Sequence, residues 1–198
     1  MVPPELGNLG SLEWLALSSN QLGGPIPPEL GNLTRLRGLM LPSTELTGPI
    51  PSELGNLGSL EWLSLHSSNL SGPIPHEIGN LTSLQFLILG ANNLSGAIPP
   101  ELGNLTGLEL LNLSSNQLRG PIPPELGKLT SLERLRFQRN SLSGTIPQTF
   151  LELDMLNLLE IQENDGLCLP STPAFLTWLR GIRRFSGSLC AASTPTSN

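Results

Sequence analysis

The sequence predicts an α/β solenoid, in which one short unit is stacked on itself along the chain. Leucines recur every 24 residues, at Leu12, Leu36, Leu60, Leu84, Leu108, Leu132 and Leu156. A glycine and an Ile-Pro pair keep the same spacing, from Gly24 and Ile26 to Gly144 and Ile146. A unit of this size cannot bury its apolar face alone, so a fixed period in this range indicates stacked repeats.

Each part of the unit has an expected structure. The alternation Leu111-Asn112-Leu113 predicts a short strand with its leucines directed inward. The prolines on either side of Ile122 extend the chain, and Glu125 opens a short helical turn, where a structural role is favoured over a catalytic one. A polar residue in the turn after the strand is expected to bond backbone groups of neighbouring copies. This position holds Asn20, Asn92, Asn116, Asn140 and Asn164, with Thr44 and Ser68 in two copies.

The full pattern, LxxLxxLxLxxNxLxGxIPxxLGxL, resembles the plant-type leucine-rich repeat over residues 3–165. This variety occurs in receptor-like kinase ectodomains and in polygalacturonase-inhibiting proteins. The resemblance implies a right-handed superhelix with a concave parallel β-sheet. The residues themselves add short 3-10 or helical turns on the convex side and a C-terminal capping helix. The resemblance also implies that the chain binds a protein or peptide and does not catalyse a reaction.

The chain is expected to divide into four parts. Residues 1–11 form an incomplete N-terminal half-repeat, and residues 12–167 form repeats with seven strands. Residues 168–190 form a C-terminal cap, and residues 191–198 a disordered tail. Because the first strand has no visible cap, its open edge is expected to fray or to associate with a second copy.

The C-terminal cap is expected to contain a helix and a disulfide. Thr172-Pro173 reads as an N-cap followed by proline in the first helical turn. An apolar stripe follows at helical spacing, made of Phe175, Leu176, Trp178, Leu179 and Ile182. Arg180, Arg183 and Arg184 are expected near the helix C-terminus. The only cysteines, Cys168 and Cys190, flank this helix, so we expect a disulfide and an oxidising compartment.

The outward positions of the strands are the candidate ligand-binding residues. One column is unusually apolar for a solvent-facing surface, and exposed apolar patches tend to mark interaction sites. The alternative is that these side chains lie flat and shield the sheet. The candidates are Trp14, Met40, Trp62, His66, Phe86, Ile88, Asn112, Arg134, Arg136 and Arg139.

The arginines at the end of this surface have two interpretations. Arg134, Arg136 and Arg139 lie one strand away from Glu160 and Glu163, so the charges can neutralise each other across the sheet. Alternatively, the arginines anchor a carboxylate, such as a peptide C-terminus or an acidic side chain. The sequence favours neither.

Composition and motifs exclude several functions. The net charge of −6 argues against non-specific binding to nucleic acid or acidic membranes. No transmembrane run and no signal peptide are visible. We predict no cofactor, no metal site and no enzymatic activity, because the two histidines, His66 and His76, have no third group placed to complete a catalytic triad.

Six N-glycosylation sequons fit a secreted glycoprotein, although the repeat consensus itself writes Asn-Leu-Thr and Asn-Leu-Ser. They begin at Asn32, Asn69, Asn80, Asn93, Asn104 and Asn112.

Three functions remain open. The first is a receptor ectodomain or secreted inhibitor that binds a protein or peptide on the concave face. The second is an intracellular scaffold within a larger protein. The third is polysaccharide or ice binding through the repetitive side surface, which the mixed row of Gly23, Thr47, Ser71, Ser95, Arg119 and Ser143 makes less favourable. An extracellular or cell-surface location is favoured over an intracellular one.

Overall fold

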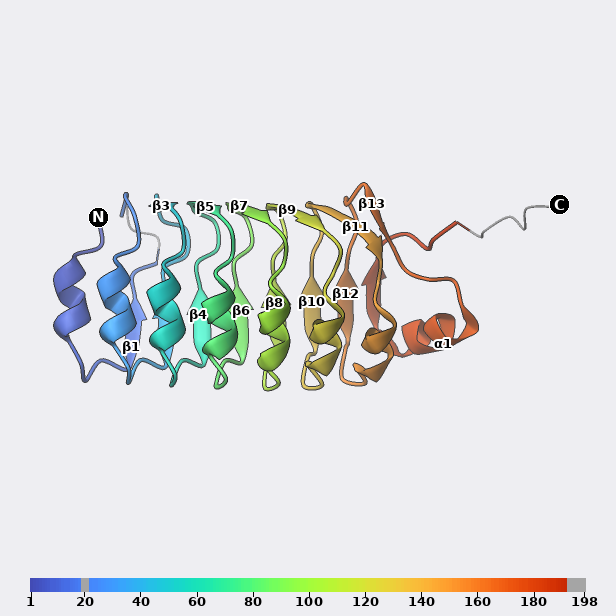
Figure 1. Ribbon diagram of the computed structural model, residues 1–198, viewed down its shortest axis with the longest axis horizontal. Helices are drawn as coiled ribbons and strands as arrows, with labels where there is room; N and C mark the ends of the chain where they lie inside the picture. The colour runs from blue at the N-terminus through green and yellow to red at the C-terminus, as the bar shows by residue number, and fades with distance from the viewer. Residues whose placement is uncertain (19–21, 192–198) are drawn as a thin grey trace.

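The computed structural model describes residues 1–18 and 22–191, which wind into a solenoid with two parallel sheets (Figure 1). The first sheet has eight strands in the described part of the chain. In spatial order they are β1 (Trp14–Ala16), β2 (Gly38–Met40), β4 (Trp62–Ser64), β6 (Phe86–Ile88), β8 (Leu110–Asn112), β10 (Arg134–Arg136), β12 (Leu158–Glu160) and β14 (Arg184–Ser186). This sheet forms the concave face, and the expected solenoid is confirmed.

The opposite side carries one short 3-10 helix per coil (Figure 1). These helices are η1 (Pro4–Asn8), η2 (Pro28–Asn32), η3 (Ser52–Asn56), η4 (His76–Asn80), η5 (Pro100–Asn104), η6 (Pro124–Lys128) and η7 (Gln148–Glu152). A proline before each helix holds the chain extended, with φ between −61° and −70°. The short helical turns of the convex side are therefore confirmed.

A second parallel sheet, which the sequence analysis did not predict, runs along the turn that follows each main strand. Its strands are β3 (Thr47–Gly48), β5 (Asn69–Gly72), β7 (Asn93–Gly96), β9 (Gln117–Gly120), β11 (Ser141–Thr145) and β13 (Gly166–Cys168). Strands β3 to β11 end at or next to the repeated glycine, whereas β13 has Cys168 at that position. Gly72 is a typical member of the glycine row, with a φ of +80° that a side chain would strain.

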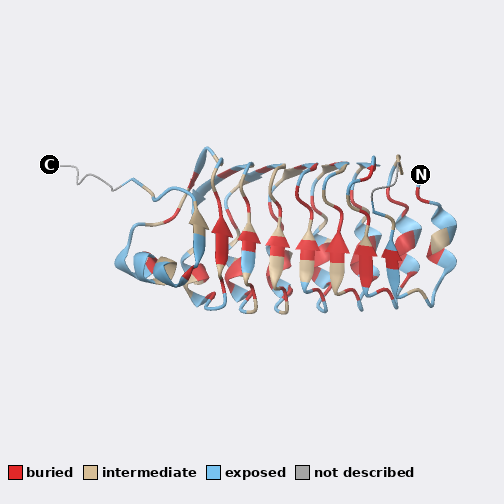
Figure 2. Ribbon diagram, turned by 180° about the vertical axis from the view of Figure 1, so that it is seen from behind, coloured by how far each residue is buried: buried red, intermediate tan, exposed pale blue. Residues whose placement is uncertain are grey.

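The core is a column of equivalent side chains from successive coils. Leu39, Leu63, Leu87 and Leu111 pair in register on neighbouring strands, and each is fully buried. In Figure 2 the middle of each main strand from β1 to β12 is buried, while the neighbouring positions reach the surface in several strands. Each coil buries its leucines against the coils directly before and after it. The stability of the solenoid therefore depends on interfaces between neighbouring coils.

The polar turn residues form the predicted hydrogen-bond ladder, but toward one neighbour only. The amide nitrogen of Asn92 donates to the carbonyls of Leu89 and Leu65, at 3.1 and 2.9 Å, and its Oδ1 accepts from the Leu70 amide at 3.1 Å. Leu65 and Leu70 belong to the preceding coil, so each asparagine joins its own coil to the one before it. Thr44 replaces part of this arrangement by donating to the Leu41 carbonyl. Asn20 lies outside the described residues.

The helix of the C-terminal cap is α1 (Pro173–Gly181), and Thr172 is its N-cap, as predicted. Phe175 and Ile182 are buried against the last coil, Trp178 and Leu179 are partly buried, and Leu176 is 36% exposed. The helix buries a narrower stripe than the sequence predicted. Cys168 and Cys190 form the expected disulfide. The predicted tail falls at residues 191–198, of which 192–198 lie outside the described residues.

The cap also adds a strand that the sequence analysis missed. Of the three arginines expected near the C-terminus of the helix, Arg180 lies in its last turn, and Arg184 lies three residues beyond Gly181, in β14, where it pairs with Leu158 of β12. Phe185 takes the inward position beside Leu159, and it packs partly buried against the core. The concave sheet consequently has eight strands instead of seven.

Candidate ligand-binding face

Strand register places the first outward residues of successive strands in one row across the concave face. The row runs Trp14, Gly38, Trp62, Phe86, Leu110, Arg134, Leu158 and Arg184. It is apolar from β1 to β8 and gains its first arginine in β10. A ligand lying across the strands therefore meets an apolar half and a basic half of this row.

Two of the predicted aromatic residues form a single surface. The rings of Trp62 and Phe86 stack with centroids 4.2 Å apart and an angle of 29° between their planes. Trp14 is 48% exposed, and its ring lies over Gly38, where an added Cβ would collide with it. The glycine in this row thus lets Trp14 lie flat toward the aromatic pair. This arrangement shields the sheet, and it also presents apolar surface to solvent.

A second outward row lies beside the first, and it runs Ala16, Met40, Ser64, Ile88, Asn112, Arg136, Glu160 and Ser186. Four predicted residues from this part of the face, His66, Ile88, Asn112 and Arg136, line one hollow of about 340 Å³. Met40 lies outside this hollow, two strands before Ile88. The structure therefore brings the aromatic pair and the hollow onto neighbouring strands.

The hollow contains the polar groups that a peptide backbone requires. Burial lowers the pKa of His66 below its ordinary value of 6.5, which favours the neutral imidazole, and its Nδ1 lies 3.0 Å from the Ser67 hydroxyl. Asn112 Oδ1 accepts from the backbone amide and the hydroxyl of Ser114, at 3.1 and 2.7 Å. These bonds fix the Asn112 side chain and leave its amide NH₂ group directed away from Ser114 as a potential donor.

The arginines at the C-terminal end differ in their partners. Arg136 Nε lies 3.3 Å from Glu160 Oε2, at ion-pair distance but without hydrogen-bond geometry. Arg139 Nε donates to both carboxylate oxygens of Glu163, at 3.2 and 3.0 Å. Arg134 is exposed and forms no ion pair within the part of the chain that the structure describes. Neutralisation therefore accounts for Arg136 and Arg139, whereas Arg134 remains available for a ligand.

Glu160 is the centre of this basic region. Its side chain is only 10% exposed, and besides Arg136 it accepts a hydrogen bond from Gln138 at 3.1 Å and lies 3.9 Å from Arg184. The sequence analysis did not place Arg184 on the concave face, because Arg184 pairs with a residue 26 positions earlier, Leu158, instead of 24 positions earlier. The signal that predicts β14 is the alternation Arg184-Phe185-Ser186, with an apolar residue between two polar ones.

Five of the six predicted sequon asparagines are exposed. Asn32, Asn80 and Asn104 end the 3-10 helices, and Asn69 and Asn93 begin strands of the second sheet. Asn112 is half-buried in the concave hollow and holds Ser114, which makes it the least accessible acceptor. Glycosylation of these residues stays a prediction.

Searches for other kinds of site within residues 1–18 and 22–191 give two negative findings. These residues contain no group of three or more His, Cys, Asp or Glu side chains that is arranged to hold a metal ion. Their helices also include none that is long and apolar enough to cross a membrane.

Comparisons with known proteins agree with the repeat pattern. The family model for the Leucine Rich Repeat matches residues 11–33, 59–81, 83–105, 107–129 and 131–153, which together exceed half of the chain. No curated protein sequence matches the chain.

Several solved structures are similar. The LRR ectodomain of the plant membrane receptor kinase GASSHO1/SCHENGEN3 from Arabidopsis thaliana, in complex with CASPARIAN STRIP INTEGRITY FACTOR 2, is 44% identical with a TM-score of 0.86. The alignment covers 91% of this chain and 22% of that chain. The plant peptide hormone receptor RGFR1 in complex with RGF2 is 39% identical with a TM-score of 0.88, over 93% of this chain and 29% of that chain.

A plant ice-binding protein is also similar, at 35% identity and a TM-score of 0.71, over 82% of this chain and 52% of that chain. The chain spans less than a third of the length of the two receptor ectodomains that it matches. By its repeats and its structure, the chain belongs to the leucine-rich repeat family.

Proposed function

We propose that the chain is a non-catalytic recognition module that binds an extended peptide, or an exposed segment of a protein, across its concave face. The observation that carries this proposal is the row that passes from the stacked Trp62 and Phe86 to the unpaired Arg134. Buried aromatic anchors supply most of the affinity in protein interfaces, and charged groups at the rim steer association.

The dimensions of the face fit a short peptide. Eight strands spaced by about 4.8 Å make a sheet roughly 34 Å wide, and an extended peptide rises about 3.3 Å per residue. A segment of about ten residues therefore crosses the whole row. The His66 hollow lies beside the middle of this path, where it accommodates one side chain of the peptide.

The solved relatives support the same class of ligand. Two of the similar ectodomains are described as plant receptors, and the one named RGFR1 as a peptide hormone receptor in complex with RGF2. The Cys168–Cys190 disulfide favours an oxidising compartment, so we place the chain outside the cell or at its surface, against the alternative of an intracellular scaffold.

The regular side surface supports the remaining alternative less well. Similarity to a plant ice-binding protein raises the possibility of ice binding, for which a flat row of equivalent side chains is expected. The side row on the second sheet contains Thr47, Ser71, Ser95 and Ser143, but Arg119 interrupts it. We therefore propose peptide recognition in preference to ice binding.

The proposal is tested by selecting binders from a displayed library of random twelve-residue peptides. Peptides selected on the intact chain are then measured against Trp62→Ala, which we expect to weaken binding by about 2 kcal/mol. Asn104→Ala, on the convex helix η5, is the matched control and is expected to leave binding unchanged. Equal losses in both variants, or inhibition of ice recrystallisation without any selected peptide, would show that the concave assignment is wrong.

A further inference from the structure

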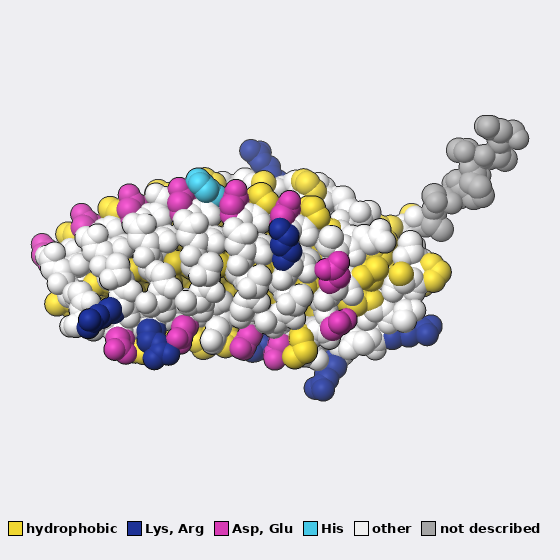
Figure 3. All heavy atoms as spheres, turned by 60° about the horizontal axis from the view of Figure 1, so that its bottom comes forward, with side chains coloured by type: hydrophobic (Ala, Val, Ile, Leu, Met, Phe, Trp, Pro, Cys, Tyr) yellow, Lys and Arg dark blue, Asp and Glu magenta, His cyan; other side chains and the backbone are white. Residues whose placement is uncertain are grey.

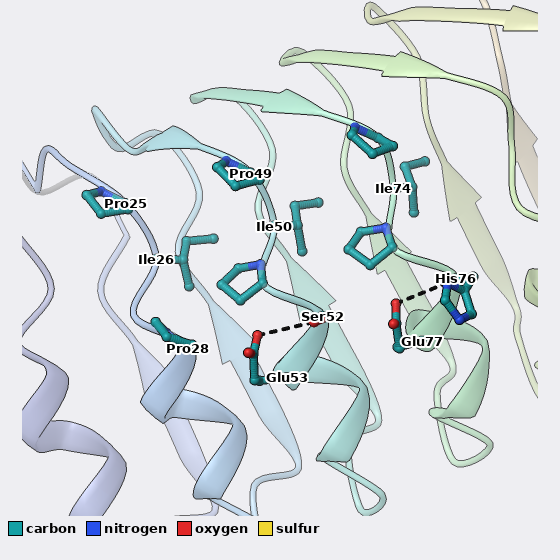
Figure 4. Close-up of a pocket in the computed structure, with 13 residues that line it drawn as sticks. Pro25, Ile26, Pro28, Pro49, Ile50, Ser52, Glu53, Ile74, His76 and Glu77 are labelled. Carbon is teal, nitrogen blue, oxygen red and sulfur yellow. Dashed lines mark hydrogen bonds and ion pairs between the residues drawn. The ribbon is translucent and has the colours of Figure 1, made fainter.

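Two hollows of the solenoid surface have linings of different character. A groove of about 730 Å³ follows the Pro-Ile-Pro segments of three coils, between the second sheet and the 3-10 helices (Figure 4). It is lined mainly by proline and isoleucine side chains, with Glu53 and Glu77 at its edge, and Figure 3 shows acidic side chains repeated along the length of the solenoid. The His66 hollow differs, because the described residues that line it include hydrogen-bonding side chains and no acidic one. Such directional groups can select one side chain of a ligand.

Gly90 forms the floor of the His66 hollow. It is buried, and it holds the same position in its coil as His66 and Ser114 hold in the two adjacent coils. Unlike Gly72, it does not have a positive φ, so the backbone does not require a glycine here. A Cβ at this position would lie 2.9 Å from Asn112 Oδ1 and 3.0 Å from Ser114 Oγ. The absence of a side chain therefore keeps the hollow open and leaves room for the hydrogen bond between Asn112 and Ser114.

The walls of the hollow supply groups with unused hydrogen-bonding capacity. Asn112 Oδ1 accepts from the amide and the hydroxyl of Ser114, which leaves the Asn112 NH₂ group as a donor. The Ser114 hydroxyl gives its proton to Asn112, so its oxygen is left as an acceptor. The imidazole of His66, whose lowered pKa favours the neutral form, uses Nδ1 on the Ser67 hydroxyl and leaves Nε2 for a ligand. The hollow consequently offers both a donor and an acceptor.

Charged and purely apolar side chains fit this lining poorly. Arg136 lines the hollow, and its Nε lies 3.3 Å from Glu160 Oε2. A ligand ammonium would lie beside the Arg136 guanidinium, and a ligand carboxylate would compete with Glu160 for it. An apolar side chain would exclude water from the Asn112 NH₂ group without replacing its hydrogen bond, which costs free energy. An amide side chain avoids these losses, because its oxygen accepts and its nitrogen donates.

We infer that the His66 hollow is a subsite for an amide side chain, a glutamine or asparagine of the bound peptide, and that Gly90 determines this selectivity. The amide oxygen of the ligand accepts from the Asn112 NH₂ group, and its nitrogen donates to the Ser114 oxygen. The methylene groups of the ligand side chain contact Ile88 and Leu110, which line the same hollow. This inference rests on the proposed peptide binding, and it adds the side chain that the middle of the concave face selects.

The test is a parallel selection from a displayed library of random twelve-residue peptides on the unaltered chain, Gly90→Ala and Gly107→Ala. Peptides selected on the unaltered chain are expected to share a glutamine or asparagine at one position. In a synthetic copy of such a peptide, changing that residue to glutamate or to leucine should weaken binding about ten-fold, because a site built for hydrogen bonding rejects a group that leaves it unpaired. Fluorescence anisotropy measures the affinities.

Gly90→Ala fills the hollow, so it should bind the amide peptide and its leucine version equally. Gly107→Ala is the matched control and should keep the discrimination of about ten-fold seen with the unaltered chain. Gly107 does not line the hollow, and a Cβ there would have only the Leu84 carbonyl oxygen within 4 Å, at 4.0 Å.

Asn112→Asp tests the same subsite without filling it. The aspartate keeps the oxygen that accepts from Ser114 and replaces the NH₂ donor with a second oxygen, so the amide peptide should bind about ten-fold more weakly. Urea unfolding establishes that each variant is folded. Selected peptides without a shared amide residue would overturn this inference and leave the proposed function in place, as would an unchanged preference for the amide over leucine in folded Gly90→Ala or in Asn112→Asp. A selection that yields no peptide would instead contradict the proposed function, and the subsite with it.

Discussion

Trp62 lies against Phe86 on the concave face, with their ring centroids 4.2 Å apart. Because the two rings are stacked on adjacent strands, either truncation exposes the side of the other ring and removes part of a shared apolar surface. We expect Trp62→Ala and Phe86→Ala to weaken a selected peptide by about 2 kcal/mol each, and the double variant by less than the sum. A double-mutant cycle measured by calorimetry with the same peptide gives the coupling. Full additivity would mean that the two rings contact the ligand independently or not at all.

The hydrogen-bond ladder predicts a strong effect of one buried amide. In Asn92→Ala, the Leu70 amide and the Leu65 carbonyl lose the partner that Asn92 provides, whereas the Leu89 carbonyl keeps a hydrogen bond from the Asn116 side-chain amide at 3.1 Å. Each unsatisfied buried group costs about 1–3 kcal/mol, so we expect unfolding in urea to become easier by at least about 2 kcal/mol.

Asn92→Thr is the matched comparison, because Thr44 occupies the equivalent position in an earlier coil and bonds the Leu41 carbonyl. The threonine variant should retain part of the lost stability. If alanine and threonine are equally destabilising, the ladder bonds contribute little and the loss comes from packing.

The sequence predicted the repeating parts of this fold far better than its end. The period fixes which side chains of the strands face inward, as the burial of Leu63 and Leu87 confirms. The second sheet was missed because its short strands contain glycine and small polar residues, which lack the alternation that marks a strand. Strand β14 was missed because the register shifts by two residues, so the 24-residue period no longer predicts Arg184.

The sequence predicted where the residues of the candidate site lie on the concave face, but it did not predict which groups their side chains contact. Sequence spacing alone brought Arg134, Arg136 and Arg139 to one end of the face, and it left open whether they bind a ligand or neighbouring glutamates. That choice depends on side-chain directions and on a buried carboxylate, Glu160, whose surroundings include the unpredicted strand β14. The sequence analysis also did not predict the groove that follows the Pro-Ile-Pro segments of three coils and is lined by Ile26, Ile50 and Ile74. The sequence pattern predicts that these isoleucines face inward, but it does not predict that the surface beside them is hollowed.

The disulfide is expected to stabilise the cap locally. Cys168 and Cys190 are 22 residues apart, and closing a loop of this length contributes on the order of 3 kcal/mol by restricting the unfolded chain. In a variant with both cysteines changed to serine, hydrogen exchange should accelerate most in α1 and β14, while β4 and β6 in the middle of the solenoid change little. Native protein with two titratable thiols would contradict the bonded state.

Stability should depend on pH through His66. Burial lowers the pKa of His66 below 6.5 in the folded chain, so the unfolded chain binds this proton more readily. Above pH 6.5 the imidazole is neutral in both the folded and the unfolded chain, so it does not lower the free energy of unfolding. As the pH falls below 6.5 toward the lower pKa of the folded chain, the unfolded chain takes up the proton first, and the free energy of unfolding decreases. We expect the free energy of unfolding to fall more between about pH 7.5 and about pH 5 in the unaltered chain than in His66→Gln. An identical pH dependence in both would show that His66 does not contribute.

Arg134 and Arg136 are expected to have separable roles although they lie in the same strand. Removing Arg136 leaves the buried Glu160 carboxylate with only Gln138 and the distant Arg184, so Arg136→Ala should lower the free energy of unfolding by about 1–2 kcal/mol. Arg134 has no such partner, and Arg134→Ala should change it by less than about 0.5 kcal/mol. Adding Glu160→Gln to Arg136→Ala should restore much of the loss, because the uncompensated charge is then gone.

For binding, we expect the reverse of the stability result, with Arg134 contributing more than Arg136. Arg134→Glu is expected to slow association of a selected acidic peptide, in a manner that disappears at high salt, because an exposed charge acts mainly on the encounter rate. Arg136→Ala combined with Glu160→Gln preserves the local charge balance and should leave the association rate nearly unchanged. Surface plasmon resonance at two salt concentrations separates these outcomes. If the combined variant slows association as much as Arg134→Glu does, the paired arginine also takes part in recognition, and the division of roles between Arg134 and Arg136 is wrong.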